Sequence, residues 1–233
     1  MPSPMATALW RGLKSVMPII LGYLPVGFAY GVLAEKSGLS LFNTVAMSVI
    51  VYAGSAQLIG TGLIAGGVGA VALVFTTFIV NLRHLLMSAA LSPKLKGWKK
   101  WRVAFFAAEM TDETFALHSL RMTAANPPQA ETFTINLLAH SSWVVGSLAG
   151  FVAGGQIADV RPVGLDYALP AMFIALLVPQ VLKPLYLVMA VCAAALSVTL
   201  LLLGFDQANV IVATIVCATV GACLDAWINR KFF

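Results

Sequence analysis

Charged side chains occur inside two apolar runs of this sequence, where ionised groups are rare. Arg83 and His84 lie near the end of the run 68–91, which is long enough to cross a bilayer as a helix. The following run, 102–120, carries three carboxylates: Glu109, Asp112 and Glu113. A charged group at membrane depth costs about 2.5–3.5 kcal/mol on insertion scales, so it usually serves a site or pairs with a partner. One cation near three acids indicates a transport pathway more than a structural membrane domain.

The three carboxylates share one face of a helix drawn through the run 102–120. Three ionised carboxylates this close would repel one another. We therefore expect one to be protonated, or paired with Arg83, with His84 or with a bound cation. A buried carboxylate of this kind can carry a proton, so we predict that all three take part in ion coupling. The alternative is that the helix begins later and the acids lie at the membrane interface.

A polar stripe runs along the helix expected over 68–91. Its members are spaced three or four residues apart: Thr77, Asn81, His84 and Ser88. Arg83 points to a nearly opposite face, so Arg83 and His84 should have different roles. We predict that Asn81, Arg83 and His84 contact the substrate. The alternative is that the stripe hydrogen-bonds neighbouring helices while Arg83 snorkels to the headgroups.

Helix-breaking residues interrupt the first two apolar runs. The first contains Pro25, Gly27 and Tyr30, where the proline frees a backbone carbonyl and the glycine lets a ligand approach. In the second, Gly54 and Gln57 share a face, which places a gap beside an amide. Because transporters hold substrates on unwound helices at mid-membrane, we predict that these five residues bind the substrate. Simple kinks for helix packing are the alternative.

A second polar stripe, in the run 133–153, contains Asn136, His140, Trp143 and Ser147. Its glycines at 146, 150 and 154 have the small-xxx-small spacing that predicts close helix packing. His140 could contact substrate or relay protons, although a hydrogen-bonded core histidine is more common. The three histidines lack the compact spacing of a metal site, so we expect no metal, no cofactor and no catalytic residues.

The elements that must position these residues are membrane helices. The sequence of 233 residues is 60% hydrophobic and 10% charged, whereas soluble domains contain about 25% charged residues. Eight apolar runs follow one another: 15–34, 41–63, 68–91, 102–120, 133–153, 167–182, 185–203 and 208–228. None alternates with period two, so helices are expected in place of a β-barrel. We predict an all-α polytopic membrane protein, a single domain over 1–233, with about seven transmembrane helices (six to eight), some broken or re-entrant.

The distribution of basic residues constrains the topology. Basic side chains cluster in loops and near the termini, at Arg11, Lys14 and the segment 94–102, as cytoplasmic anchors do, and their positions do not suggest nucleic acid binding. If the N-terminus is cytoplasmic, three full crossings would place 94–102 outside, against the positive-inside rule. We therefore expect that one early run does not cross fully, and the run 15–34, with Pro25, is the best candidate. An external N-terminus is the alternative.

Several ordered segments resemble the AzlC family, the large subunit of bacterial branched-chain amino acid exporters. The matching segments are Pro25-Val26-Gly27-Phe28-Ala29-Tyr30-Gly31, Ala53-Gly54-Ser55-Ala56-Gln57, Asn81-Leu82-Arg83-His84, Thr111-Asp112-Glu113-Thr114-Phe115-Ala116 and Ala168-Leu169-Pro170-Ala171-Met172-Phe173. Each segment alone is weak, but the ordered set over about 150 residues is specific. The resemblance implies export of branched-chain or other hydrophobic amino acids across the bacterial inner membrane. It also implies a small AzlD-type membrane partner subunit.

The expected mechanism is alternating access around a site near the membrane centre. The protein would be a secondary transporter, since the sequence has no Gly-rich phosphate loop. Helix-end amides or Arg83 would take the substrate carboxylate, and Asp112 or Glu113 would take the ammonium or a coupling proton. Phe28, Tyr30 and Trp143 could line a pocket for the aliphatic side chain. The rival functions are an intramembrane enzyme that uses the buried acids and histidines, or a passive channel.

Overall fold

The computed structural model describes residues 3–124, 127–157, 183–205 and 209–231, together with the single positions 164, 167, 171, 174, 177, 178 and 181. Within these residues the regular structure is helical, as the sequence predicts. The chain divides into two units, Met1–Phe173 and Ile174–Phe233, and each is described by itself. The predicted run 167–182 and the family-like segment 168–173 lie largely outside the described residues.

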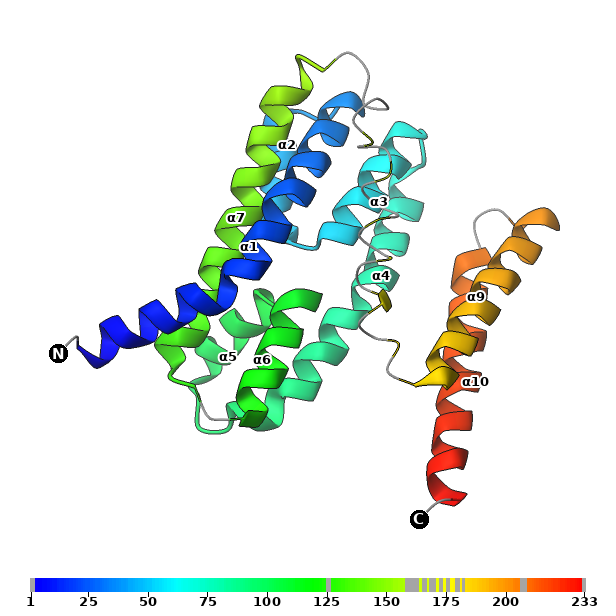
Figure 1. Ribbon diagram of the computed structural model, residues 1–233. Helices are drawn as coiled ribbons and strands as arrows, with labels where there is room; N and C mark the ends of the chain where they lie inside the picture. The colour runs from blue at the N-terminus through cyan, green and yellow to red at the C-terminus, as the bar shows by residue number, and fades with distance from the viewer. Residues whose placement is uncertain are drawn as a thin grey trace. The chain divides into compact units, whose positions relative to one another are not determined.

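Two long helices of the first unit pack directly against each other: α1 (Pro4–Lys36) and α7 (Gln129–Gly154). Glycines line their interface on both sides. A Cβ at Gly27 would lie 3.0 Å from the Trp143 carbonyl oxygen, and a Cβ at Gly31 or Gly150 would overlap the backbone of the facing helix. The small-residue spacing therefore does serve close helix packing, as predicted for α7. These two helices form the frame around which the rest of the unit is arranged (Figure 1).

The second apolar run folds back on itself. It forms α2 (Leu41–Ala46), a π-helical turn η1 (Met47–Val51), and then α3 (Gly54–Ala65). The chain reverses at Tyr52, whose φ of 45° and ψ of 49° are left-handed. Ile64, near the end of α3, returns to line one pocket with Gly38 and Asn43, near the start of α2. Each arm of this first hairpin spans about 17 Å at 1.5 Å per residue, too short for a bilayer core of about 30 Å.

The fourth apolar run makes a second hairpin from the opposite end of the unit. Its arms are α5 (Lys100–Ala108) and α6 (Asp112–Ala124), separated by a break at 109–111. Thr111 and Thr114 start α6 with a reciprocal cap: each hydroxyl accepts a hydrogen bond from the other residue's backbone N–H, at 3.3 and 2.8 Å. The three carboxylates therefore do not share the face of one continuous helix, and that expectation is wrong. Figure 1 shows the two hairpins entering the unit from opposite ends.

The two hairpins correct the expected topology. α1 continues as one helix through Pro18 and Pro25, so the expected break in the first run is wrong, and the second run is the one that turns back. α4 (Ala70–Leu91) then leads through a 3₁₀ turn, η2 (Ser92–Leu95), to the basic loop. Before that loop, only α1 and α4 run from one end of the first unit to the other. The basic loop therefore lies at the same end as Arg11 and Lys14. The positive-inside rule predicts that this basic end faces the cytoplasm.

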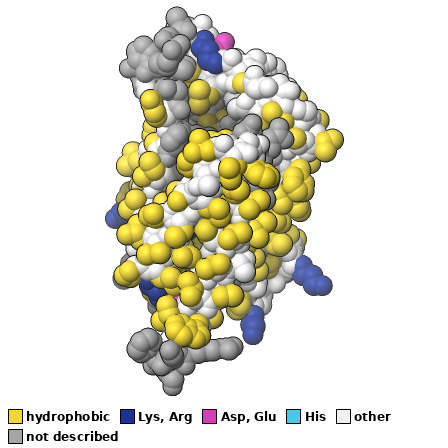
Figure 2. All heavy atoms as spheres, turned by 90° about the vertical axis from the view of Figure 1, so that its right-hand side faces the viewer, with side chains coloured by type: hydrophobic (Ala, Val, Ile, Leu, Met, Phe, Trp, Pro, Cys, Tyr) yellow, Lys and Arg dark blue, Asp and Glu magenta, His cyan; other side chains and the backbone are white. Residues whose placement is uncertain are grey.

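The second unit is a pair of helices, α9 (Pro184–Leu202) and α10 (Asn209–Lys231). Lys183 donates a hydrogen bond to Asp225 at 2.7 Å, and Met189 packs on Gly221. Four helices in the described residues are long and apolar enough to cross a membrane, namely α1, α4 with η2, α7 and α9. Of the eight predicted runs, 15–34, 68–91, 133–153 and 185–203 fall on these four helices. Hydrophobic side chains are spread over the face in Figure 2, and many large apolar residues are exposed, as expected of a protein in contact with lipid.

Candidate functional site

The tips of the two hairpins meet between α1, α4 and α7. Arg83 of α4 contacts both tips: its Nη2 lies 3.0 Å from Asp112 Oδ2 of the second hairpin and donates a hydrogen bond to the Ser55 hydroxyl of the first. Both partners lie in the first turn of a helix. Arg83 therefore does not snorkel to the headgroups, because its charge is paired inside the unit.

His140 of α7 also contacts both tips. Its Nδ1 lies 2.9 Å from Glu109 Oε2 in the second hairpin, and its Nε2 lies 3.1 Å from the Ser48 carbonyl oxygen in the first. A carbonyl oxygen only accepts, so Nε2 carries a hydrogen. The other contact then needs one proton, on Nδ1 or on the Glu109 carboxyl. In either arrangement the His140–Glu109 pair is electrically neutral as a whole.

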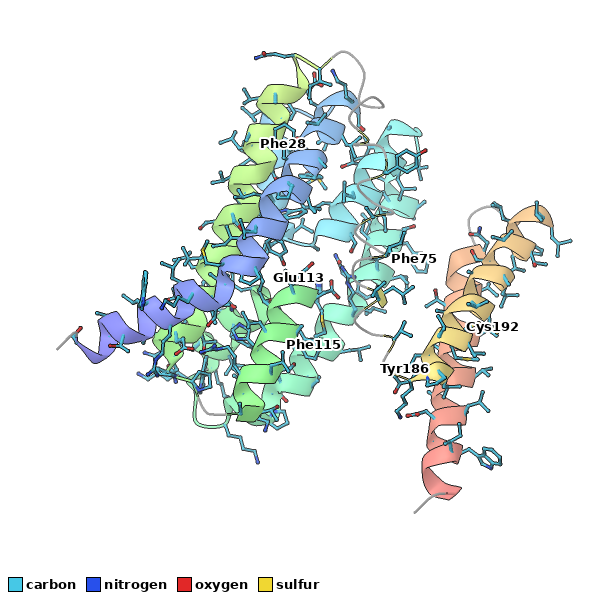
Figure 3. All side chains as sticks on the ribbon, in the orientation of Figure 1. Phe28, Phe75, Glu113, Phe115, Tyr186 and Cys192 are labelled. Atoms are coloured by element: carbon cyan, nitrogen blue, oxygen red, sulfur yellow. The ribbon has the colours of Figure 1, made fainter. Side chains whose placement is uncertain are left out.

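Glu113 is the third carboxylate, and it faces a hydroxyl. Tyr23 of α1 donates a hydrogen bond to Glu113 Oε2 at 2.7 Å, and its oxygen lies 2.6 Å from the Thr111 hydroxyl. No cationic side chain pairs with Glu113 within the described part of the chain. Figure 3 places Glu113 at the tip of the second hairpin, directed into the centre of the unit. Since Arg83 neutralises Asp112 and His140 neutralises Glu109, an ionised Glu113 is left with an uncompensated charge.

Tyr52, at the reversal of the first hairpin, is the second tyrosine at this centre. It is 4% exposed, and its ring stacks on His140 at 4.0 Å between centroids. Its ring also meets Tyr23 edge to face, at 6.4 Å. The Tyr52 hydroxyl faces the side chains of Tyr23 and Thr111, but no hydrogen bond of normal geometry joins it to a described residue. A buried hydroxyl left open costs about 1–3 kcal/mol, so this group is a candidate ligand contact.

The space predicted beside Gly54 is filled by the Trp143 side chain. A Cβ at Gly54 would lie 2.8 Å from the indole ring, and the Trp143 Nε1 donates to Gln57 Oε1 at 3.0 Å. The Gln57 amide donates to the Ser48 hydroxyl at 3.0 Å, which in turn donates to Ser147. In this structure Gln57 thus holds the arms of the first hairpin together and anchors them to α7.

The other predicted substrate residues occupy different places. Pro25 is exposed on the outer side of α1, and Gly27 packs against α7. Tyr30 is fully buried, and its hydroxyl donates to the Thr44 carbonyl oxygen at 3.3 Å. On α4, the Asn81 Oδ1 and the His84 Nε2 are buried without a hydrogen-bond partner in the described residues, so both remain available for a ligand.

Four residues of the centre were missed by sequence reasoning: Tyr23, Ser48, Tyr52 and Thr111. Tyr23 had a usable signal, since it lies seven residues before Tyr30 and therefore on the same helix face. Thr111 begins one of the family-like segments, whereas Ser48 and Tyr52 had no signal, because their roles depend on where the first hairpin turns. Phe28 of α1, predicted to line a pocket, lies well away from Glu113 of α6 (Figure 3).

The arrangement can bind a small zwitterion and hold a proton. The first turn of α3 carries N–H groups without helical partners. Gln57 Oε1 accepts from the Ala53 N–H at 3.2 Å, and the N–H groups that follow it lie beside Arg83, which suits a carboxylate. Glu113 suits an ammonium group or a proton. The described residues contain no group of three or more His, Cys, Asp or Glu side chains that could hold a metal ion.

Comparisons with known proteins agree on one family. The family model described as "AzlC protein" matches residues 18–157. The chain is 30% identical to "Inner membrane protein YgaZ" of Escherichia coli K12, over 97% of this chain and 94% of that protein. It is 29% identical to "Branched-chain amino acid transport protein AzlC" of Bacillus subtilis, over 85% and 80%. A membrane protein of Archaeoglobus fulgidus is 30% identical over 93% and 94%. No solved structure matches the chain.

Proposed function

The chain belongs to the AzlC family of membrane transport proteins, and from this we propose that it exports branched-chain or other hydrophobic amino acids. The Bacillus subtilis relative is named for branched-chain amino acid transport, and the Escherichia coli relative is named an inner membrane protein. Export across the bacterial inner membrane in exchange for protons is the finer form of this proposal. A small AzlD-type subunit is the proposed partner.

The observation that carries the proposal is the meeting of two opposed hairpins at one charged centre. Irregular backbone is tolerated at membrane depth only where protein or water surrounds it, and transporters place substrate sites at such breaks. Each hairpin closes the centre from one end of the unit. Alternating access then requires one tip to withdraw while the other stays in place, against the frame of α1 and α7.

The charge balance at the centre supports a placement of the substrate groups. The substrate carboxylate binds at the start of α3, near Ser55, where Arg83 supplies a positive charge. The ammonium binds Glu113, beside the open hydroxyl of Tyr52. The aliphatic side chain packs on the buried aromatic cluster that includes Tyr23, Tyr30 and Trp143.

Glu113 also gives a mechanism for coupling. One carboxylate holds a proton or an ammonium group, but not both at once, because each neutralises the same charge. A proton that enters from outside displaces the amino acid from Glu113 and lets it leave. Return of the protonated centre to the cytoplasmic side releases the proton and restores the site. The result is exchange of one proton for one amino acid, with no phosphate-driven step.

Efflux from cells loaded with a valine dipeptide tests the proposal. Glu113→Gln should lower the efflux rate at least about tenfold, because it removes the shared negative charge. Glu35→Gln is the matched control, since Glu35 lies at the end of α1 beside Lys36 and outside the centre. Wild-type efflux by Glu113→Gln would contradict the coupling role. Flux without saturation and without response to a proton gradient would favour the passive channel.

A further inference from the structure

A buried histidine that the proposed mechanism does not use lies between α6 and α7. His118 of α6 and Asn136 of α7 are both fully buried, and the His118 Nε2 lies 2.6 Å from the Asn136 Oδ1. Phe106 of α5 covers the imidazole ring at 5.0 Å between centroids. Because His118 comes six residues after Asp112, the first residue of α6, the pair lies more than one helical turn from the tip of the second hairpin, toward the basic end.

Each partner of this pair keeps a polar atom without a hydrogen bond. The His118 Nδ1 and the Asn136 Nδ2 have no partner among the described residues. If Nε2 donates to the asparagine oxygen, then Nδ1 is a free acceptor and Nδ2 a free donor. Leaving each unpaired in an apolar seam would cost about 1–3 kcal/mol. Buried polar atoms of this kind are normally satisfied by ordered water.

Polar groups continue from this pair to the centre. Thr114 lies one turn before His118 on the same face of α6 and is fully buried. Its hydroxyl lies 3.1 Å from the Thr111 hydroxyl, which contacts Tyr23, and Tyr23 donates to Glu113. A chain of hydroxyls thus runs from this part of α6 to the carboxylate proposed to hold the coupling proton.

Polar groups also continue toward the basic end. Thr132 lies one turn before Asn136 on α7 and is fully buried. Beyond it, Arg121 of α6 pairs with Glu131 of α7 and donates to the Ser15 hydroxyl of α1 at 2.7 Å. Arg121 is also the charged side chain that interacts electrostatically with His118. The arginine is itself neutralised by Glu131, which is 1% exposed.

We propose that the α6–α7 seam is a water-filled proton path between the cytoplasmic end and Glu113, with His118 as its titratable relay. Among the relay side chains of this path, imidazole alone takes up and gives back a proton near neutral pH, since threonine and asparagine do not titrate and tyrosine ordinarily titrates at about pH 10. His118 receives a proton from a water O–H at one ring nitrogen and gives the proton of the other nitrogen to a neighbouring oxygen, so only N–H and O–H bonds change. This inference rests on the proton coupling proposed above.

Reconstituted vesicles separate the relay from a structural role. Two rates are compared, valine transport driven by a pH gradient and valine–valine exchange at equal pH, because exchange moves no net proton. His118→Gln should lower gradient-driven transport at least about tenfold while exchange stays within about twofold of wild type. Thr123→Ala is the control, since Thr123 is exposed on the same helix and outside the path.

A second variant covers the risk that the first disturbs folding. In His118→Ala, added imidazole should restore gradient-driven transport, which a purely structural role would not allow. Gradient-driven transport that survives in His118→Gln, or equal loss of both rates without imidazole rescue, would overturn the relay. If the wild-type protein itself ignores the pH gradient, the proton coupling fails and the relay fails with it. If wild type and His118→Gln both keep valine transport driven by the pH gradient, the relay is wrong and the proton coupling stands.

Discussion

Arg83 and His140 stand on different long helices, yet both join the same two hairpin tips. Arg83 links Ser55 to Asp112, and His140 links the Ser48 carbonyl to Glu109. Each of these two residues thus bridges the two hairpins, which enter the unit from opposite ends. Withdrawal of either tip must therefore break one contact of each residue. This coupling is a physical reason for the tips to move alternately, since charged groups left unpaired at this depth are costly.

Substitutions of Arg83 and Asp112 should have non-additive effects on the free energy of unfolding, whereas combining them should not restore transport. Arg83→Gln leaves Asp112 without its cation, and Asp112→Asn leaves Arg83 without its anion, so each should cost about 1–3 kcal/mol. The double variant removes both charges and should recover part of the loss, because no unpaired charge remains. Thermal unfolding of the purified variants measures this. Transport by the double variant should stay low, since the carboxylate site is lost.

Two nearby tyrosines should respond differently to loss of their hydroxyls. Tyr52→Phe removes a group with no hydrogen bond in the described residues, so the unfolding temperature should not fall. If that hydroxyl contacts the substrate, its loss should raise KM by about tenfold, as about 1.4 kcal/mol of binding implies. Tyr23→Phe breaks the bonds to Thr111 and Glu113 and should destabilise the protein by about 1–3 kcal/mol. A drop in stability for Tyr52→Phe would contradict this assignment.

The α1–α7 interface should tolerate no added methyl group at its closest point. Gly31→Ala places a Cβ against the Ser147 carbonyl and the backbone that follows it, so the two helices must separate. Overpacking of this kind costs about 1–3 kcal/mol or more, and folded yield should drop. Gly22→Ala is the control, because a Cβ there meets nothing within 4 Å. Equal stability of the two variants would argue against this packing.

Membrane sidedness tests the hairpin directly. After the native cysteines are replaced, single cysteines at Lys36 and Ala65 flank the first hairpin, and one at Lys96 lies in the basic loop. All three positions are exposed. Because the first hairpin returns to its starting end, Lys36→Cys and Ala65→Cys should react with an impermeant thiol reagent from the same side. Lys96→Cys should react from the other side. Labelling of the first two from opposite sides would show that the run 41–63 crosses.

Much of the site chemistry was readable from the chain alone. The apolar runs, the three acids and Arg83 are local features, and their composition predicted a helical membrane protein with an ionic centre. The glycine spacing on the run 133–153 predicted close packing and is confirmed, because small-xxx-small spacing is itself the property that lets two backbones approach. The positive-inside rule indicated that one early run fails to cross or that the N-terminus is external, and it favoured the run 15–34, whereas the structure turns the run 41–63 back.

The sequence determined what kinds of groups lie in the membrane, because burial in lipid depends on composition along a short stretch. Only the tertiary structure decided which groups meet. A single helix over 102–120 would place the three acids on one face. The chain instead breaks before the reciprocal cap of Thr111 and Thr114, and each acid meets a different partner. The left-handed turn at Tyr52 likewise cannot be read from a periodic pattern. Pairings such as Glu109 with His140 join residues far apart in sequence, and only packing fixes those distances.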